Sequence, residues 1–238
     1  MIYNVRGTSG SGKTHLLRQI VNHYDGAEIT DETGKIFGYR LPARLRVLGR
    51  YDDAIKGGGV DNITGALVKR FAASGGKGNS MDAIEAQVRR WAGAGHHVLF
   101  EGLIVTGVWG RWEALARELP VHFLFLDTPL GVCYERVMAR NGGKPIKGWP
   151  GGSDLEAKHR STERQASSIS KGAAAAERQL KKVRSQSTLE DFHNRQIERQ
   201  IPKASAGELR YTILDHTCAF DQLREILEAE IPGLEASR

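Results

Sequence analysis

The segment GTSGSGKT at residues 7–14 constrains this chain more than any other feature, because it matches the pattern G-x-x-x-x-G-K-[ST] at every position. Apolar residues 1–5 precede it, and residues 15–21 carry apolar side chains at helical spacing. In such a strand–loop–helix unit, glycines let backbone N–H groups surround phosphate oxygens at the start of a helix. The segment therefore predicts a site for a nucleoside triphosphate, formed by Gly7, Thr8, Ser9, Gly10, Ser11, Gly12, Lys13 and Thr14.

Two side chains of this phosphate-binding loop (P-loop) have expected roles of their own. Lys13 is expected to reach the β- and γ-phosphates, and the hydroxyl of Thr14 is expected to bind Mg²⁺. The loop alone does not separate kinases from GTPases, ATPases and motor proteins. The sequence has no N-K-x-D segment for guanine recognition and no L-S-G-G-Q segment of transporter ATPases. The class of enzyme therefore has to be read from the rest of the chain.

Apolar and turn-forming segments alternate along the chain. Extended segments are expected at 27–30, 35–41 and 45–51, as a hairpin or meander, and at 97–102, 121–127 and 209–214. Helices are expected to end near residues 24 and 73 and to span 80–91, capped by Ser80, and 220–231. The last three extended segments are apolar without alternation, as in strands covered on both faces. The pattern predicts an α/β fold, a P-loop NTPase three-layer sandwich with a mainly parallel central sheet.

A carboxylate lies at or next to the end of each of these three apolar segments. The carboxylates are Glu101, Asp127 and Asp215. In a parallel sheet the carboxyl ends of the strands meet at one edge, and ligands bind at that edge. We therefore expect these carboxylates and the P-loop to lie at the same edge of the sheet.

Residues 142–205 interrupt the alternation with a glycine-rich loop and a mainly helical stretch. Residues 136–203 contain 15 Lys and Arg against 7 Asp and Glu, so this part of the chain holds all of the basic excess. Its apolar content is too low for a separately folding unit, so we expect one domain, 1–238, with 142–205 as a basic helical lid or insertion. The charge suits a phosphate-clamping lid or a surface for a polyanion, and a solvated helical face is the third interpretation.

The composition also bears on location. No apolar run approaches the ~18 residues that a membrane span requires, and the N-terminus lacks a secretory segment. Two cysteines are too few for a disulfide framework and suit a reducing compartment. We expect a cytoplasmic protein that does not contact a membrane.

Arg136 and Arg140 lie four residues apart in the segment YERVMAR, so they project from one face of a helix beside the glycine-rich loop. Phosphoryl transfer needs such cations, because negative charge spreads over the γ-phosphoryl oxygens. We expect both arginines to act in catalysis, with a solvated helix face as the alternative.

The P-loop, the segment VLFEGLI at 98–104 and the segment FLFLDTPLGVCYERVMAR at 123–140 resemble small P-loop kinases of nucleosides, nucleotides and nucleic-acid ends. The likeness covers most of residues 1–140 in order. It implies a phosphotransferase that uses ATP and Mg²⁺, in which Glu101 helps to hold the metal directly or through water. The structural alternative for Glu101 is a carboxylate that caps the next turn.

Three further features narrow this likeness: VLGRYD at 47–52, GGVD at 58–61 and the basic insertion. Together with the core they resemble the bacteriophage 5-hydroxymethyluracil DNA kinases of thymidine hypermodification. The resemblance implies transfer of the γ-phosphate of ATP to the hydroxymethyl group of this base in polymeric DNA.

Such a reaction needs a carboxylate that accepts the proton of the primary hydroxyl. Asp52 and Asp53 directly follow the 45–51 segment, and Asp61 follows three glycines. In uridine kinases the base carboxylate occupies the place of Asp52 or Asp53, so we rank Asp52 first and Asp61 second. Arg50, on the same loop, is expected to position a phosphate of the nucleic acid. Aspartates that only stabilise loop turns are the alternative.

A base stacked in a duplex cannot reach a deep cleft, so extrusion of the base or distortion of the duplex is expected. The candidate stacking surfaces are Trp109, Trp112 and Trp149, with core packing as the alternative for each. The expected phosphodiester contacts are Lys144, Lys147, Lys158, Arg160, Arg164, Lys181, Lys182 and Arg184.

Two other functions stay open. A kinase of free nucleosides or nucleotides would share the whole core, although a monomeric substrate offers few phosphates for so many cations. A DNA-binding ATPase without phosphotransfer would need a water-orienting residue and usually an arginine finger, which the sequence does not reveal. A monomer and a dimer both fit the sequence.

Overall fold

The computed structural model describes residues 1–52, 58–186 and 209–235. Its centre is a seven-stranded sheet with the strand order β2-β3-β4-β5-β1-β6-β7. The strands are β1 Ile2–Arg6, β2 Ala27–Thr30, β3 Ile36–Arg40, β4 Leu45–Leu48, β5 His97–Glu101, β6 Val121–Asp127 and β7 Arg210–Asp215. Neighbours from β4 to β7 pair in parallel, whereas β2 and β3 pair antiparallel. The mainly parallel sheet predicted from the sequence is confirmed.

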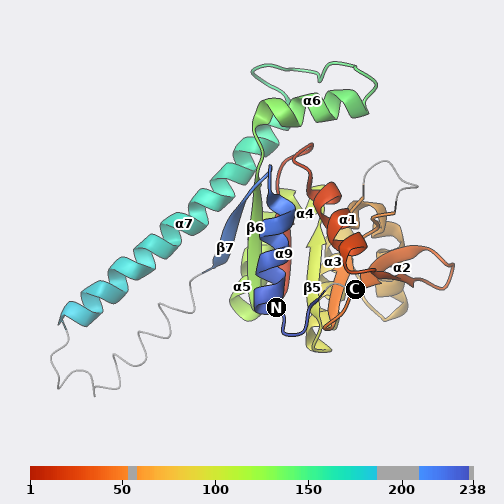
Figure 1. Ribbon diagram of the computed structural model, residues 1–238, viewed down its shortest axis with the longest axis horizontal. Helices are drawn as coiled ribbons and strands as arrows, with labels where there is room; N and C mark the ends of the chain where they lie inside the picture. Colours follow the sequence, from red (N-terminus) through yellow and green to blue (C-terminus); the bar gives the residue numbers. More distant parts are fainter. Residues whose placement is uncertain (53–57, 187–208, 236–238) are drawn as a thin grey trace.

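Helices cover both faces of this sheet, which gives the three layers of a P-loop NTPase sandwich (Figure 1). The helices are α1 Lys13–His23, α2 Thr64–Ala73, α3 Ser80–Gly93, α4 Leu103–Gly107, α5 Trp109–Glu118, α6 Leu130–Arg140, α7 Asp154–Gln186 and α9 Ala219–Glu230. Apolar side chains of α1 and α9 form the core on one face, and those of α2, α3 and α5 form the core on the other. The central strands are buried on both faces, and this explains why their sequences are apolar without alternation.

The antiparallel meander β2-β3-β4 lies at one edge of the sheet, as the sequence predicts. Strand β4 ends earlier than expected, at Leu48, because Gly49 has a φ of 131° and turns the chain out of the sheet. The expected cap at Ser80 is also wrong. Asn79 caps α3 instead, since its side chain accepts hydrogen bonds from the backbone N–H groups of Met81 and Asp82.

The insertion begins directly after α6. Its described part is the loop at 141–153 and α7, a helix that runs from Asp154 to Gln186 and extends away from the sheet (Figure 1). Leu155 packs against the α6 side chains Cys133 and Val137, and Ile169 packs into the core beneath the sheet. Residues 187–205 of the expected insertion lie outside the described residues.

The carboxyl ends of the parallel strands meet at one edge of the sheet, as expected. Glu101 ends β5, and Asp127 and Asp215 are partners in the β6–β7 register. The P-loop leaves β1 between β5 and β6, at this same edge. In the part of the chain that the structure describes, no helix combines the length and the apolar character needed to cross a bilayer.

Candidate active site

The P-loop connects β1 to α1 through two glycines that no other residue could replace without strain. Gly10 and Gly12 have φ values of 81° and 102°, a region that side chains with a Cβ rarely adopt. A Cβ on Gly10 would also lie 2.4 Å from the carbonyl oxygen of Cys133 in α6. The loop is therefore held against α6, and its N–H groups gather at the start of α1, where an anion is favoured.

Lys13 is buried at the base of this loop. Its Nζ donates hydrogen bonds to the carbonyl oxygens of Gly7, at 2.7 Å, and Thr8, at 3.0 Å. Burial lowers the pKa of Lys13, and the nearby carboxylates of Glu101 and Asp61 oppose this shift. The ammonium group thus lies inside the loop that would surround the phosphates.

Glu101 is buried at the end of β5 and accepts a 2.9 Å hydrogen bond from the hydroxyl of Thr14. Burial raises the pKa of Glu101, and the charge of Lys13 together with the Thr14 hydrogen bond opposes the rise. The two oxygen-bearing side chains expected to hold Mg²⁺ are therefore in contact. Hard oxygen ligands of this kind suit Mg²⁺, which takes few protein ligands and completes its shell with phosphates and water.

The glycines at 58 and 59 let a loop approach this pair of side chains. A Cβ on Gly58 would lie 2.3 Å from Cγ2 of Thr14, and a Cβ on Gly59 would lie 2.2 Å from Oε1 of Glu101. Gly59 also has a φ of 80°. The close approach brings Asp61, two residues after Gly59, to the same region.

Asp61 accepts hydrogen bonds from the backbone N–H groups of Leu103, at 2.7 Å, and Ile104, at 3.3 Å. Its carboxylate thus caps the start of α4, which directly follows Glu101 and Gly102. A Cβ on Gly102 would lie 3.0 Å from Asp61, so glycine at this position gives the carboxylate its room. These bonds fix where Asp61 points.

These groups share one open cavity of about 720 Å³, here called the phosphate cleft. The residues that line the phosphate cleft include the P-loop, both metal candidates, Asp61 and both α6 arginines: Ser9, Gly10, Gly12, Lys13, Thr14, His15, Arg18, Gly58, Asp61, Asn62, Glu101, Leu103, Arg136, Ala139 and Arg140. Arg136 also donates to the carbonyl oxygens of Gly10, at 3.3 Å, and Ser11, at 3.4 Å. The structure therefore brings the predicted cationic pair to the P-loop.

A second cavity of about 590 Å³ adjoins the phosphate cleft, and Gly12, His15 and Arg136 line both. Its far wall is the loop 216–218 after β7, together with Phe220 of α9. This second cavity is therefore a candidate place for the nucleobase of the triphosphate.

Asp52, which the sequence ranked first as the catalytic base, does not line the phosphate cleft. Its carboxylate forms an ion pair with Arg50, and its backbone carbonyl accepts a 3.3 Å hydrogen bond from Arg18. The structure thus joins Asp52 to the residue expected to position a phosphate. Asp53 lies outside the described residues.

The tryptophans after Glu101 do not form an exposed stacking surface. Trp112 is fully buried and packs against Phe100, with ring centroids 5.0 Å apart, which contradicts its expected contact with DNA. Trp109 packs against Phe123, at 4.9 Å, and the guanidinium of Arg6 lies 5.1 Å from its ring. Trp112 thus belongs to the core on this face of the sheet, and the partly buried Trp109 packs against it.

The loop at 141–153, here called the lid loop, carries three of the remaining candidates. Lys144 and Lys147 are exposed, and Trp149 stacks on Tyr134 of α6 with ring centroids 4.4 Å apart. Lys181, Lys182 and Arg184 fall in the C-terminal part of α7, and their side chains lie outside the described residues. Their contact with DNA stays a prediction.

Two arginines near the site were not singled out from the sequence. Arg18 lines the phosphate cleft and donates a 2.8 Å hydrogen bond to the carbonyl oxygen of Tyr51. Its position four residues after Thr14 on the same helix was an available signal. Arg6 is buried beneath the P-loop and has no comparable signal, since it lies in an apolar strand. It donates to Gln165 of α7 at 2.9 Å and to the carbonyl oxygen of Thr106 at 2.9 Å, and burial lowers its pKa to about 9.

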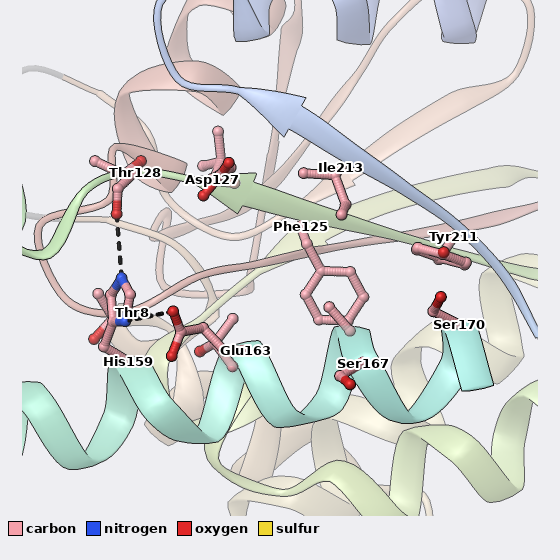
Figure 2. Close-up of a pocket in the computed structure, with 13 residues that line it drawn as sticks. Thr8, Phe125, Asp127, Thr128, His159, Glu163, Ser167, Ser170, Tyr211 and Ile213 are labelled. Carbon is pink, nitrogen blue, oxygen red and sulfur yellow. Dashed lines mark hydrogen bonds and ion pairs between the residues drawn. The ribbon is translucent and has the colours of Figure 1, made fainter. Parts of the chain in front are cut away.

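A groove of about 350 Å³ separates the first half of α7 from β6 and β7 (Figure 2). Phe125, Tyr211 and Ile213 form its apolar side, whereas His159 and Glu163 of α7 stand at its polar end (Figure 2). There His159 contacts the carbonyl oxygen of Thr128 at 3.3 Å. The α7 helix is thus tied to the loop after β6, beside the P-loop.

The parallel sheet, the P-loop and a cleft that joins lysine, arginines and carboxylates define a P-loop kinase, a phosphotransferase. More specifically, the chain belongs to the 5-hmdU DNA kinase family, whose model matches residues 1–148. The match ends within the lid loop, so α7 lies beyond it.

Three phage proteins are similar to this chain. The 5-hmdU DNA kinase of Pseudomonas phage M6 is 34% identical over 157 residues, which cover 60% of this chain and 74% of the relative. That of Pseudomonas phage PaMx11 is 33% identical over 170 residues, covering 68% and 80%. The 5-hmdU DNA kinase 1 of Salmonella phage ViI is 32% identical over 147 residues, covering 60% of each chain.

Proposed function

We propose that this enzyme transfers the γ-phosphate of ATP to the hydroxyl of 5-hydroxymethyldeoxyuridine in DNA. Family membership and the names of three relatives support the substrate. The observation that carries the chemistry is the phosphate cleft, where Lys13, Glu101 and Asp61 meet. Because the relatives are phage proteins, we expect the enzyme to act in the host cytoplasm.

The donor half of the reaction rests on the P-loop. Its N–H groups and Lys13 bind the triphosphate, and the adjoining cavity beside residues 216–218 receives the adenine base. Thr14 and Glu101 would hold Mg²⁺, which when bound neutralises phosphate charge and orients the phosphates. Among the described residues, no group of three or more His, Cys, Asp or Glu side chains is placed to hold a metal ion.

The acceptor half of the reaction rests on Asp61. The acceptor oxygen forms a bond to the γ-phosphorus, its proton passes to the Asp61 carboxylate, and the bond from phosphorus to the leaving oxygen of ADP breaks. We favour Asp61 over Asp52 because Asp61 lines the phosphate cleft and its carboxylate is held by two backbone N–H groups.

Arg136 and Arg140 supply the positive charge for the transferred group. Both line the phosphate cleft from α6, and Arg136 contacts the P-loop directly. Charge that develops on the phosphoryl oxygens is stabilised most by groups already in place before the reaction. The contact of Arg136 with the loop carbonyls provides that placement.

We assign binding of the DNA backbone to the basic lid, with Lys144 and Lys147 in the loop and Lys181, Lys182 and Arg184 in α7. Neutralised phosphates release counterions, so the logarithm of affinity should fall with the logarithm of salt concentration by about 0.9 per contact. Charge reversal at Lys181, Lys182 and Arg184 should flatten this slope. An unchanged slope would place the DNA elsewhere.

A transfer assay tests the function. Labelled ATP is incubated with the enzyme and, separately, DNA containing 5-hydroxymethyldeoxyuridine, unmodified DNA, and the free nucleoside and nucleotide. We expect label in the modified DNA only, and none with Lys13→Ala, while the exposed Lys35→Ala serves as the matched control. Label restricted to the free nucleoside or nucleotide would establish the alternative kinase, and ATP hydrolysis without labelled acceptor would establish the ATPase.

A further inference from the structure

Asp61 forms part of two cavities. On one side it lines the phosphate cleft, and on the other it lines a pocket of about 370 Å³, here called the side pocket. The other residues of the side pocket are Thr64, Asn79, Ser80, Met81 and Ile104. The hydroxyl that loses its proton must lie beside the catalytic base, Asp61. A group bound in the side pocket would therefore lie next to the reacting oxygen.

The walls of the side pocket combine apolar and polar groups. Met81 comes from α3 and Ile104 from α4, so two apolar side chains reach the pocket from different helices. Thr64 and Ser80 add hydroxyl groups from the first residues of α2 and α3. The volume falls within the ~300–1,000 Å³ typical of small-molecule sites. A flat ring with a polar edge matches these walls.

The helix that begins at Thr64 adds an electrostatic preference. No described side chain caps the start of α2, so its first N–H groups are available as donors. The partial positive charge at such an end favours an electron-rich acceptor, such as a ring carbonyl oxygen, over an amino group. A uracil-type ring has a carbonyl oxygen at C4, the position where cytosine has an amino group.

The opposite wall of the side pocket is held in place. Asn79 and Asp82 cap α3 reciprocally, with the Asn79 N–H donating to Asp82 at 2.7 Å. Arg111 of α5 pairs with Asp82 at 2.8 Å and with Glu85 at 3.0 Å. The start of α3 is therefore fixed to α5, and a fixed wall loses little entropy when a ligand binds.

We propose that the side pocket holds the pyrimidine ring of the target nucleotide, extruded from the DNA stack, between Met81 and Ile104. The carbonyl edge faces Thr64 and Ser80, and the 5-hydroxymethyl group points past Asp61 into the phosphate cleft. This inference rests on the proposed function and adds how the enzyme selects its target nucleobase. It predicts a preference for 5-hydroxymethyluracil over 5-hydroxymethylcytosine.

Photo-crosslinking locates the ring without any need for catalysis. DNA that carries 5-iodouracil at the target position is irradiated with the enzyme, and the attached peptide is identified by mass spectrometry. We expect the crosslink within residues 79–81 or at Ile104. A crosslink confined to the lid loop, residues 141–153, would overturn the proposal.

Pocket variants test the same point by kinetics. Ser80→Phe fills the side pocket, so kcat/KM for the modified DNA should fall ~10-fold or more, with the KM for ATP unchanged. Ser74→Phe, at the exposed far end of α2, is the matched control. Thr64→Val keeps the volume, removes one hydroxyl and should raise the KM for this DNA ~3- to 10-fold. Wild-type values for both pocket variants would overturn the proposal.

Different results would refute the proposed function and the placement of the pyrimidine ring. A wild-type enzyme that transfers no phosphate to modified DNA would refute the proposed function. Transfer that proceeds normally, together with no crosslink in the side pocket and unaffected pocket variants, would refute only the placement of the base.

Discussion

The hydroxyl of Thr14 donates a hydrogen bond to the carboxylate of Glu101 across 2.9 Å, and so joins the P-loop to the end of the neighbouring strand. The two residues are 87 positions apart in the chain. The parallel pairing of β1 with β5 brings them together, with Val5 opposite Glu101 in the register. The proposed metal site is therefore a product of sheet topology.

Glu101→Gln should weaken the use of Mg²⁺ while leaving the fold intact. The amide oxygen can still accept the Thr14 hydrogen bond, but the negative charge is lost. We expect the Mg²⁺ concentration for half-maximal transfer to rise about tenfold or more. Magnesium titration of the activity measures this, with the exposed Glu118→Gln as control. A wild-type magnesium requirement would remove Glu101 from the metal site.

Asp61→Asn should lower turnover, because the amide cannot accept the proton of the acceptor hydroxyl. We expect kcat to fall about 10²–10⁴-fold with little change in the KM for ATP. The control is Asp52→Asn, at the carboxylate that pairs with Arg50. Rapid-quench measurement of a single turnover separates the chemical step from binding. A larger loss of kcat in Asp52→Asn than in Asp61→Asn would restore the ranking based on the sequence.

Trp112→Ala should destabilise the protein without a specific effect on DNA binding. The indole is fully buried against Phe100, and removal of such a side chain costs about 3–5 kcal/mol. Urea denaturation gives the free energy of unfolding, and DNA affinity is measured at a temperature where the variant is folded. The matched comparison is Trp149→Ala in the lid loop. A selective loss of DNA affinity in folded Trp112→Ala would contradict the core assignment.

Glu156→Gln should destabilise the lid in a pH-dependent way. Glu156 accepts hydrogen bonds from the N–H groups of Gly151, Gly152 and Ser153, which lower its pKa from 4.5 to about 2. Since the folded pKa is depressed, the stabilisation is fully present above about pH 4.5 and is lost as the pH falls toward 2. The difference in unfolding temperature between wild type and variant should be constant from pH 8 to about 5 and narrow below that. A gap that does not depend on pH would show that the charge is irrelevant.

The P-loop and the mainly parallel sheet could be predicted, because each depends on a pattern that is local in the sequence. A glycine pattern fixes the loop, and unalternated apolar strands place Glu101 at the ligand edge. The burial of Trp112 and Trp109 could not be predicted, since the sequence of an amphipathic helix does not show which side of the helix packs against the sheet. The choice between Asp52 and Asp61 depended on the Gly58–Gly59 approach to Thr14 and Glu101, a contact between distant segments.

Charge was also an incomplete guide. The sequence located the basic excess in residues 136–203, and the structure brings Arg136 and Arg140 of that segment to the P-loop. The sequence does not reveal that Arg6 is buried and donates a hydrogen bond to Gln165, 159 residues away. A count of charged residues along the sequence does not show which charged side chains are buried.

The loop at 141–153 and α7 follow α6 in the connection between β6 and β7, two neighbouring parallel strands. Parallel neighbours always require a connection that passes over the sheet, and the length of that connection does not affect their register. The part of this connection that follows α6 can therefore change in length while Arg136 and Arg140 stay at the P-loop. Diversification of the family across different genomes is expected to concentrate here, while the strands on either side keep their places.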